Sequence, residues 1–304
     1  MSASVPRLLV VGGNGFLGSA ICRLAVGKGW DVSSMSSSGK PYATPAGHTP
    51  AWAPRVKWHA ASAFSPDSYS TLIGESTAVV HTLGILLEDV GYKQSVKSGD
   101  VFGLVKSFAS SLSGGDGNPL KSEEERKRGY EGMNKDSALT VLDTLISTTP
   151  PTSTQTRPFV YISAADAFRP VVPRRYIETK RQAEIEIMRK CDEHPEAGVR
   201  PTFIRPGLMY HPHIRPLTTL PAFLVDLSAK LSTASGLPNP FASKSPLHGA
   251  LESLRTYPLH VDHVAAAVLK CIEEGRGGVV EVPEMRDWAG LGSKKKAEVG
   301  LQGQ

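Results

Sequence analysis

The sequence predicts an α/β fold built on a doubly wound parallel sheet with a small C-terminal cap. Short apolar runs alternate with helical segments, and a cluster of glycines separates the first run from its helix. This alternation is typical of parallel sheets, because each parallel crossover needs a helix-length connection. Three of the runs are almost continuously apolar, which indicates strands that are covered on both faces. The predicted strands read RLLVV, WDVSSM, RVKWHA, TAVVHTLG, FVYIS and VRPTFIRPG.

The stretch VVGGNGFLGSAICRLAVGKGW carries the clearest sign of a bound ligand. It predicts a strand, a tight turn and a helix over residues 15–29, which is the arrangement of a Rossmann dinucleotide-binding unit. Such a turn brings backbone N–H groups close to a pyrophosphate at a helix N-terminus. An ordinary strand-to-helix turn would show a similar pattern. The residues expected to bind the cofactor here are Gly12, Gly13, Asn14, Gly15, Phe16, Leu17 and Gly18.

Two regions interrupt the alternation of strands and helices. Residues 86–128 form a polar insertion that is too long for an ordinary connection, and SEEE near its end predicts a capping box for a helix running to Ile146. Residues 208–257 are rich in Pro, Leu and Ser. We therefore expect a Rossmann domain over 1–207, a substrate cap with a returning helix (261–274) over 208–283, and a disordered tail over 284–304.

Composition narrows the class of protein. The 304 residues are 40% apolar and 21% charged, as in soluble globular proteins, and no apolar run approaches the ~18 residues of a membrane-spanning helix. The net charge of +5 is spread along the chain, so we expect no nucleic-acid partner, whereas an anionic cofactor or peripheral association with a membrane suits it. The three cysteines are far apart, which predicts free thiols and no metal site.

The N-terminal region is basic and poor in acidic residues. No Asp or Glu precedes Asp31, while Arg7, Arg23 and Lys28 are cationic. This pattern is typical of organelle targeting, and it fits a phosphate-binding unit that avoids carboxylates equally well.

Candidate catalytic residues surround the fifth strand. Tyr176 and Lys180, in YIETK, are four residues apart and so lie on one face of a helix. Ser163 ends the fifth strand thirteen residues before Tyr176, and Asn134 lies in the preceding helix.

In this order and spacing, the motifs resemble those of the short-chain dehydrogenases/reductases of the extended or atypical branch. The resemblance covers about residues 8–283 and includes the glycine pattern, Ser163, Tyr176-x-x-x-Lys180, RPGLMY and HVDHVA. Within that family, GGNGFLGSAICR, VVHTLGIL and YISA are most similar to fungal mitochondrial members associated with coenzyme Q biosynthesis. They are also similar to an NAD(P)H-binding accessory subunit of respiratory complex I.

The resemblance implies a role for each candidate catalytic residue. Tyr176 would exchange a proton with a substrate oxygen, and Lys180 would hold the nicotinamide ribose and lower the pKa of Tyr176. Ser163 would hydrogen-bond the substrate oxygen, and Asn134 would support a proton-relay water.

Further cofactor contacts are expected at other strand ends. Pro206 and Gly207, in RPGLMY, would border the nicotinamide, and His81 in the fourth strand would pack beside the cofactor. The family often has an Asp after the third strand that contacts the adenine. In this sequence Ser62 is the polar residue at that place, and we expect it to contact the cofactor instead.

The end of the second strand predicts which dinucleotide is bound. NAD-binding proteins usually carry an acidic residue there for the ribose 2′-hydroxyl, but this chain reads SMSSSGK and has Asp31 at the start of the strand. Ser36, Ser37, Ser38 and Lys40 can instead hold a 2′-phosphate. We therefore predict NADP as the cofactor, with NAD as the alternative.

Together these features predict an NAD(P)-dependent oxidoreductase of mitochondrial ubiquinone biosynthesis, on the matrix side of the inner membrane. Its substrate would be an apolar or aromatic small molecule, such as a quinone precursor, and it would have protein partners in a mitochondrial complex. One alternative is a nucleotide-loaded assembly subunit without turnover, which would present residues 86–128 to its partners. A sugar-nucleotide epimerase or dehydratase is a third reading, disfavoured because SAADAF offers only Asp166 as an acidic partner.

Overall fold

The computed structural model describes residues 5–85, 129–149, 156–166, 172, 174–212 and 258–291. The predicted insertion (86–128), with its SEEE capping box, lies outside the described residues, as does most of the predicted cap (213–257). In the described part of the chain, no helix is long and apolar enough to cross a membrane.

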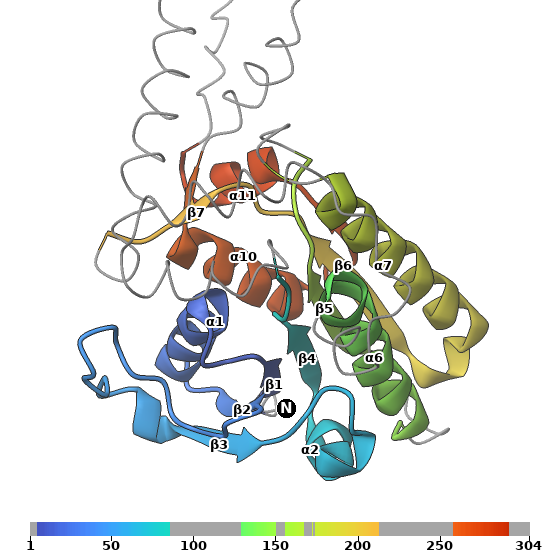
Figure 1. Ribbon diagram of the computed structural model, residues 1–304, viewed down its shortest axis with the longest axis horizontal. Coiled ribbons are helices and arrows are strands. Elements are labelled where there is room, and N and C mark those ends of the chain that lie inside the picture. The colour runs from blue at the N-terminus through green and yellow to red at the C-terminus, as the bar shows by residue number, and fades with distance from the viewer. Residues whose placement is uncertain are drawn as a thin grey trace, which may run out of the picture.

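A parallel sheet of seven strands forms the centre of the molecule (Figure 1), which confirms the predicted α/β fold. Its strand order is β3-β2-β1-β4-β5-β6-β9. A separate pair of short strands consists of β7 and β8. The strands are β1 (Arg7–Val11), β2 (Asp31–Ser36), β3 (Val56–Ala60), β4 (Ala78–His81), β5 (Arg157–Ile162), β6 (Val199–Ile204), β7 (Met209–Tyr210), β8 (Leu259–His260) and β9 (Gly278–Val280).

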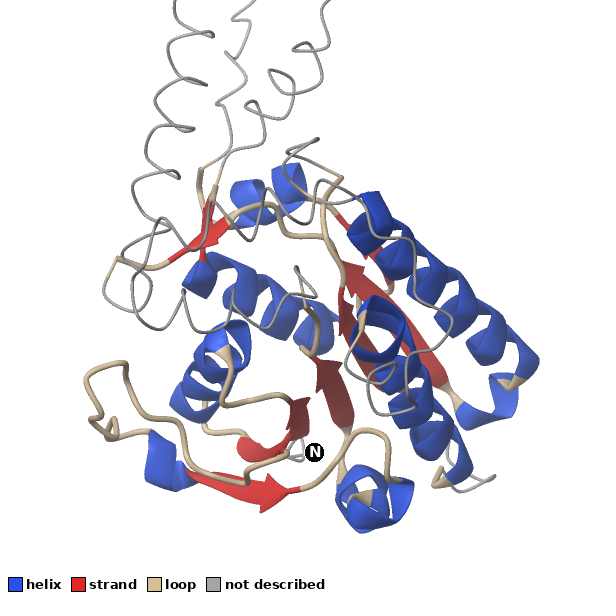
Figure 2. Ribbon diagram, in the orientation of Figure 1, coloured by secondary structure: helices blue, strands red, loops and turns tan. Residues whose placement is uncertain are grey.

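Helices cover both faces of the sheet (Figure 2). On one face α1 packs beside α10, and on the other α2, α6 and α7 lie together. The helices are α1 (Phe16–Gly27), α2 (Ser70–Glu75), α6 (Ser137–Ser147), α7 (Arg174–Glu193), α10 (Val261–Glu274) and α11 (Val282–Trp288). A π-helical turn, Gly132–Asp136, leads directly into α6.

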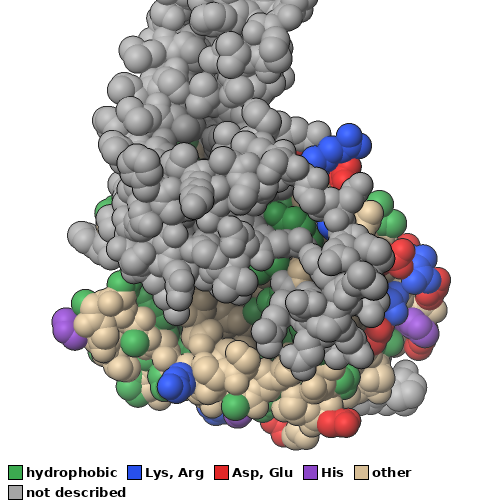
Figure 3. Space-filling model, viewed as in Figure 1, with side chains coloured by type: hydrophobic (Ala, Val, Ile, Leu, Met, Phe, Trp, Pro, Cys, Tyr) green, Lys and Arg blue, Asp and Glu red, His purple; other side chains and the backbone are tan. Residues whose placement is uncertain are grey.

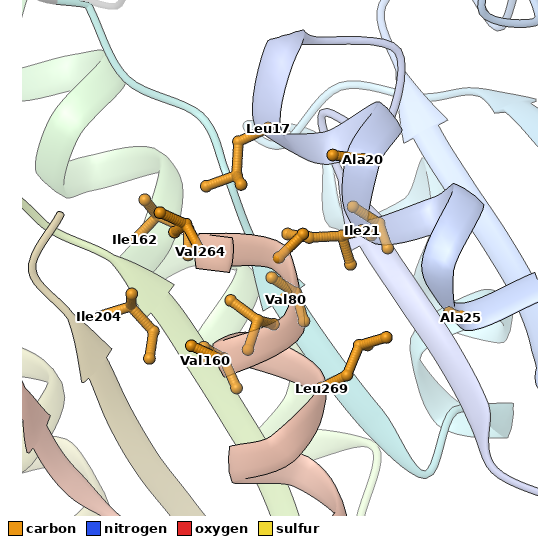
Figure 4. Packing of buried hydrophobic residues seen from close by; sticks show 14 of the residues in the cluster. Leu17, Ala20, Ile21, Ala25, Val80, Val160, Ile162, Ile204, Val264 and Leu269 are labelled. Atoms are coloured by element: carbon orange, nitrogen blue, oxygen red, sulfur yellow. The ribbon is translucent and has the colours of Figure 1, made fainter. Parts of the chain in front are cut away.

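Each face of the sheet buries its own apolar cluster. Figure 4 shows the cluster under α1 and α10, in which Ile21 and Leu269 lie against Val80 and Val160 of the sheet. All four side chains are fully buried, and burying one such side chain contributes roughly 1.5–3 kcal/mol. As predicted, β1, β4 and β5 are buried along almost their whole length, because both faces of the sheet are covered.

The outer face of α7 is mostly charged, although Ile185 and Met188 are also exposed on this helix. In Figure 3, Lys and Arg side chains alternate with Asp and Glu side chains over this helix, on the right of the view. Arg174 pairs with Glu178, and Arg189 pairs with both Glu186 and Glu193. The opposite side of the helix faces the sheet and carries the buried Lys180 and Glu184.

Two expected boundaries differ from the structure. The tail predicted to be disordered from residue 284 begins inside α11, whose Met285 is completely buried against the core. The segment 208–283 assigned to the cap also supplies β9, which pairs with β6 as the edge strand of the main sheet. Both elements are short, so periodicity in the sequence did not reveal them.

The sheet reverses its winding direction between β1 and β4. Val11, at the end of β1, pairs with Met35 of β2 on one side and with His81 of β4 on the other. The chain runs outward to β3 on the first side and then returns to β4 on the second. In open α/β sheets, ligands bind in the crevice at the carboxyl ends of the strands beside this reversal. The glycine turn follows β1 at this edge, and Thr82–Ile85 follow β4.

Candidate functional site

The glycine turn is shaped by close contacts between backbone atoms. Gly12 has a φ of +87°, a left-handed conformation that favours glycine, and its N–H donates to the Met35 carbonyl at 2.8 Å. A Cβ on Gly18 would lie only 2.2 Å from the Gly12 carbonyl oxygen. These two glycines let the start of α1 approach the end of β1 closely enough to form the turn.

The N-terminus of α1 suits an anionic ligand. Gly15 occupies the N-cap position and is exposed, no side chain caps the helix there, and its first turn carries no acidic residue. Backbone N–H groups and the helix dipole therefore meet the strand edge without competition from a carboxylate. Leu17 is buried in the core cluster, so its side chain is not part of this surface. This geometry fits the pyrophosphate of a dinucleotide.

A polar loop at the end of β2 lies beside the glycine turn. The Asn14 amide donates to the hydroxyl oxygens of Ser36 (3.2 Å) and Ser38 (3.3 Å), which joins the two loops. The backbone N–H of Lys40 also donates to Ser38, at 3.3 Å, and the Lys40 residue is exposed. The loop 36–40 carries no carboxylate. Asp31 lies at the opposite end of β2, where it pairs with Lys57.

Ser62 lies in the turn after β3. Its hydroxyl accepts the Phe64 N–H at 3.3 Å, and its own N–H donates to Ser68 at 3.2 Å. Ala61, its neighbour, donates to the Ser36 carbonyl at 3.0 Å. The structure thus places Ser62 next to the polar loop, where it stabilises a turn.

Lys180 lies at the centre of the candidate site. Its Nζ donates to the carbonyl oxygens of Ile162 at 2.8 Å and Leu83 at 3.4 Å, and it lies 4.7 Å from the centre of the Tyr161 ring. Burial lowers the pKa of the Lys180 amine to about 7, and the Glu184 carboxylate one helical turn away partly opposes this shift. Lys180 can therefore change its charge near neutral pH.

Tyr176 lies one turn before Lys180 on α7 and is partly exposed. Its ring is tilted against that of Tyr130, with 6.4 Å between ring centres. Burial raises the pKa of the Tyr161 phenol, and the neighbouring Tyr176 adds to the shift. Tyr176, Lys180 and Tyr161 therefore form one group at the ends of β4 and β5.

Asn134 belongs to this group through the π-helical turn. Its carboxamide makes two hydrogen bonds with the backbone of Ile85, accepting from the N–H at 2.9 Å and donating to the carbonyl at 3.1 Å. Its own carbonyl oxygen accepts a hydrogen bond from the Tyr161 hydroxyl. Asn134 thus holds the segment after β4, and its support of a relay water stays a prediction.

Ser163 has partners that the sequence did not reveal. Its hydroxyl donates to the Glu184 carboxylate at 2.5 Å and accepts from Arg181 at 3.0 Å. Arg205 also donates to Glu184, at 3.0 Å through its Nε, so two guanidinium groups neutralise this buried carboxylate. In this structure the Ser163 hydroxyl is bonded to Glu184, and its contact with a substrate oxygen stays a prediction. The sequence signal that could have indicated this partner is the position of Glu184, one helical turn beyond Lys180 on α7.

His81 lies inside the protein rather than at its surface. Its ring stacks on Tyr161 with 5.8 Å between ring centres, and its Nε2 lies 3.1 Å from the Ser137 hydroxyl. That hydroxyl donates to the Met133 carbonyl, so its oxygen accepts a hydrogen bond from the Nε2–H of His81. Burial lowers the pKa of His81 to about 3, which keeps the ring neutral. His81 therefore packs behind the site, and its contact with a cofactor stays a prediction.

Pro206 and Gly207 follow β6 at the same edge of the sheet. The Pro206 carbonyl accepts the Ala165 N–H at 2.8 Å, which ties the loop after β6 to the loop after β5. Pro206 is buried and Gly207 is half-buried.

In the described residues, no group of three His, Cys, Asp or Glu side chains is arranged to hold a metal ion.

Comparisons with solved structures show the type of fold. The fold is similar to an oxidoreductase of the short-chain dehydrogenase/reductase family from Burkholderia thailandensis, with a TM-score of 0.57 and 11% identity over 96% of this chain and 99% of that one. It is also similar to the UDP-glucose 4-epimerase of Thermus thermophilus in complex with NAD (TM-score 0.51, 17% identity, 91% and 77% covered). The chain has a short-chain dehydrogenase/reductase fold.

Sequence relatives make the assignment more specific. MIOREX complex component 2 of Saccharomyces cerevisiae is 41% identical over 216 residues, which are 69% of this chain and 74% of the yeast protein. An uncharacterised chloroplast protein of Arabidopsis thaliana is 28% identical over 272 residues, 88% of this chain and 72% of that protein. No family model matches the chain. The protein belongs to the family of yeast MIOREX complex component 2.

The buried amine of Lys180 predicts how stability depends on pH. The unfolded chain keeps the lysine proton up to about pH 10.5, whereas the folded protein releases it near pH 7, so the unfolded state binds more protons between these values. Lys180 therefore adds a contribution to the free energy of unfolding that rises with pH, so the slope against pH should be more positive than that of Lys180→Met by about 1.4 kcal/mol per pH unit. Urea unfolding between pH 7.5 and 9.5 measures both slopes. The exposed Lys57→Met is the control, and equal slopes in all three proteins would contradict the assignment.

Proposed function

We propose that the protein binds a nicotinamide dinucleotide at the glycine turn and acts as an NAD(P)-dependent oxidoreductase. The observation that carries the proposal is the buried Lys180, one helical turn from Tyr176, at the sheet edge where the glycine turn lies. When bound, the nicotinamide would supply or accept the hydride. The short-chain dehydrogenase/reductase fold supports this proposal, and the function itself rests on the site.

The chain's own residues would bind the cofactor and move the proton. Backbone N–H groups after Gly15 would hold the pyrophosphate. Among the described residues, two of the three donors of the Lys180 ammonium go to backbone carbonyls, and the third would bind a ribose hydroxyl when Thr82–Ile85 opens to admit the cofactor. Its charge would also lower the pKa of Tyr176. A tyrosine normally titrates near ~10, and a shift of about three units toward neutrality is worth roughly 4 kcal/mol.

The relatives and the sequence resemblance support a proposal for the biological setting. The yeast relative is named as a component of the MIOREX complex, so we propose that this protein also has protein partners and works in mitochondria. The resemblance to coenzyme Q proteins supports an apolar or aromatic substrate, such as a quinone precursor, on the matrix side of the inner membrane. Sites of this kind combine an apolar lining with a few polar groups.

A second candidate function is a nucleotide-loaded complex subunit without turnover. The bond from Ser163 to Glu184 favours it, because the hydroxyl expected to orient a substrate oxygen is already used. The name of the yeast relative, a complex component, favours it as well. The epimerase reading rests on similarity of fold, and after β5 the stretch SAADAF offers it only Asp166 as an acidic partner.

The polar loop after β2 predicts a preference for NADPH over NADH. Lys40 is exposed beside Ser38, so its ammonium can reach a 2′-phosphate. A charge-assisted hydrogen bond contributes about 1.5–3 kcal/mol, so Lys40→Ala should weaken NADPH binding roughly tenfold or more and leave NADH binding unchanged. Fluorescence titration with both cofactors measures the ratio, with Lys57→Ala as the matched control. Equal affinities of the native protein for NADPH and NADH would refute the preference.

Replacing Tyr176 by Phe separates the two candidate functions. The substitution removes one hydroxyl, and the ring contact with Tyr130 and the glycine turn should persist. An oxidoreductase would keep its cofactor affinity and lose ~10²–10⁴-fold in turnover, which is the usual contribution of a general acid or base. Quinone output in cells carrying the variant at native protein levels measures the loss. Tyr69→Phe, which removes a hydroxyl that donates to the Ala63 carbonyl, is the control. Full quinone output with Tyr176→Phe would rule out the oxidoreductase and favour the complex-subunit function.

A further inference from the structure

A buried polar cluster lies between the carboxyl ends of β4 and β5 and the start of α6. Its side chains are Tyr161, His81, Ser137, Asn134 and Lys180, each no more than 2% exposed. Burying this many polar groups costs free energy unless each finds a partner. Their hydrogen bonds with one another and with the backbone show what the cluster holds in place.

Side chains of the cluster support the π-helical turn. A π turn breaks the regular hydrogen bonding of a helix, and such turns are frequent at functional sites. Here the Tyr161 hydroxyl donates to the Asn134 carbonyl oxygen, and the Ser137 hydroxyl donates to the Met133 carbonyl at 2.9 Å. Tyr161 comes from β5, so its bond fixes the turn to the sheet.

The π-helical turn also holds the backbone segment that covers Lys180. The two hydrogen bonds of the Asn134 carboxamide hold Ile85 as a neighbouring strand would. Gly84, next in the chain, lies so close that a Cβ there would be 2.9 Å from both Asn134 Oδ1 and Lys180 Nζ. The Leu83 carbonyl accepts from the same ammonium at 3.4 Å. Segment Thr82–Ile85 therefore closes over Lys180 in direct contact.

We propose that Tyr161 is a positioning residue for Lys180. Its hydroxyl holds the π turn at Asn134, and the Asn134 carboxamide holds Thr82–Ile85 closed over the Lys180 ammonium. The face of the Tyr161 ring, 4.7 Å from the ammonium, completes the enclosure. The use of this enclosure in catalysis rests on the proposed function, whereas the enclosure itself can be tested without a cofactor.

Among the described residues, the charged and titratable groups around Lys180 lie on β4, on β5 and on α7, where Tyr176 is one helical turn from it. His81 on β4 is neutral, and Tyr161 on β5 keeps its proton because burial raises its pKa. On α7, the Glu184 carboxylate is held by Arg181 and Arg205. Opening the segment over Lys180 would expose the amine to water without changing these groups.

The test is the rate at which acetic anhydride acylates Lys180, followed by mass spectrometry at pH 8. Tyr161→Phe removes the hydroxyl that holds the π turn and should raise the rate about five- to tenfold relative to the exposed Lys57 in the same molecule. Gly84→Ala places a methyl group against the Lys180 ammonium from outside the core and should raise the rate similarly. This second variant keeps the proposal testable if Tyr161→Phe folds poorly.

Tyr69→Phe is the matched control, because Tyr69 is also buried and donates to a backbone carbonyl, that of Ala63 at 3.1 Å, away from Lys180. It should lower the melting temperature and leave the acylation rate of Lys180 unchanged. An unchanged rate in both Tyr161→Phe and Gly84→Ala would overturn the proposal and leave Tyr161 a purely structural residue. NADPH titration of the same samples reports separately on the proposed function, since failure to bind leaves the acylation result intact.

Discussion

The arrangement of the candidate site depends on the burial of one ammonium group. Among the described residues, Lys180 has no carboxylate in hydrogen-bond contact, and its acceptors there are two backbone carbonyls at the ends of β4 and β5. An ion in this environment is costly unless its donors are satisfied, so the surrounding elements must be held accurately. Tyr161 and Asn134 do this from the sheet and from the π turn, and the cost appears as the lowered pKa of the amine.

A second buried charge anchors the same helix on its other side. Glu184 lies one turn beyond Lys180 on α7 and joins Arg181 and Arg205 to the Ser163 hydroxyl. Arg205 continues to Glu281, just before α11, at 2.7 Å. The helix that carries Tyr176 is thus fixed to β5, β6 and the C-terminal elements. This rigid support is compatible with proton transfer and with a structural subunit alike. The Tyr176 hydroxyl is therefore the group whose removal distinguishes the two functions.

Much of the fold could be predicted from the sequence because strand burial and the glycine turn leave local patterns. Gly12 and Gly18 behave as their spacing predicts, since a side chain at either would collide with nearby atoms. The site was less predictable because its contacts join distant segments. Ser163 follows the family spacing to Tyr176, yet its partner is Glu184, and nothing local in the sequence shows which way a hydroxyl at a strand end points. Short elements such as β9 and α11 carried too little periodicity to be recognised.

The central claim is that the turn after β1 binds a dinucleotide, and calorimetric titration with NADPH tests it most directly. Gly15 is the exposed N-cap of α1, and a Cβ there meets the Gly12 carbonyl oxygen at 3.1 Å, so Gly15→Val should fold but keep the pyrophosphate away from the backbone. Gly27→Val, where a Cβ meets nothing within 4 Å, is the matched control in the same helix. The account predicts one NADPH per chain in the native protein and in Gly27→Val, and a loss of affinity of tenfold or more in Gly15→Val. Equal affinity in a folded Gly15→Val variant, or no binding of NADPH or NADH by the native protein, would contradict it.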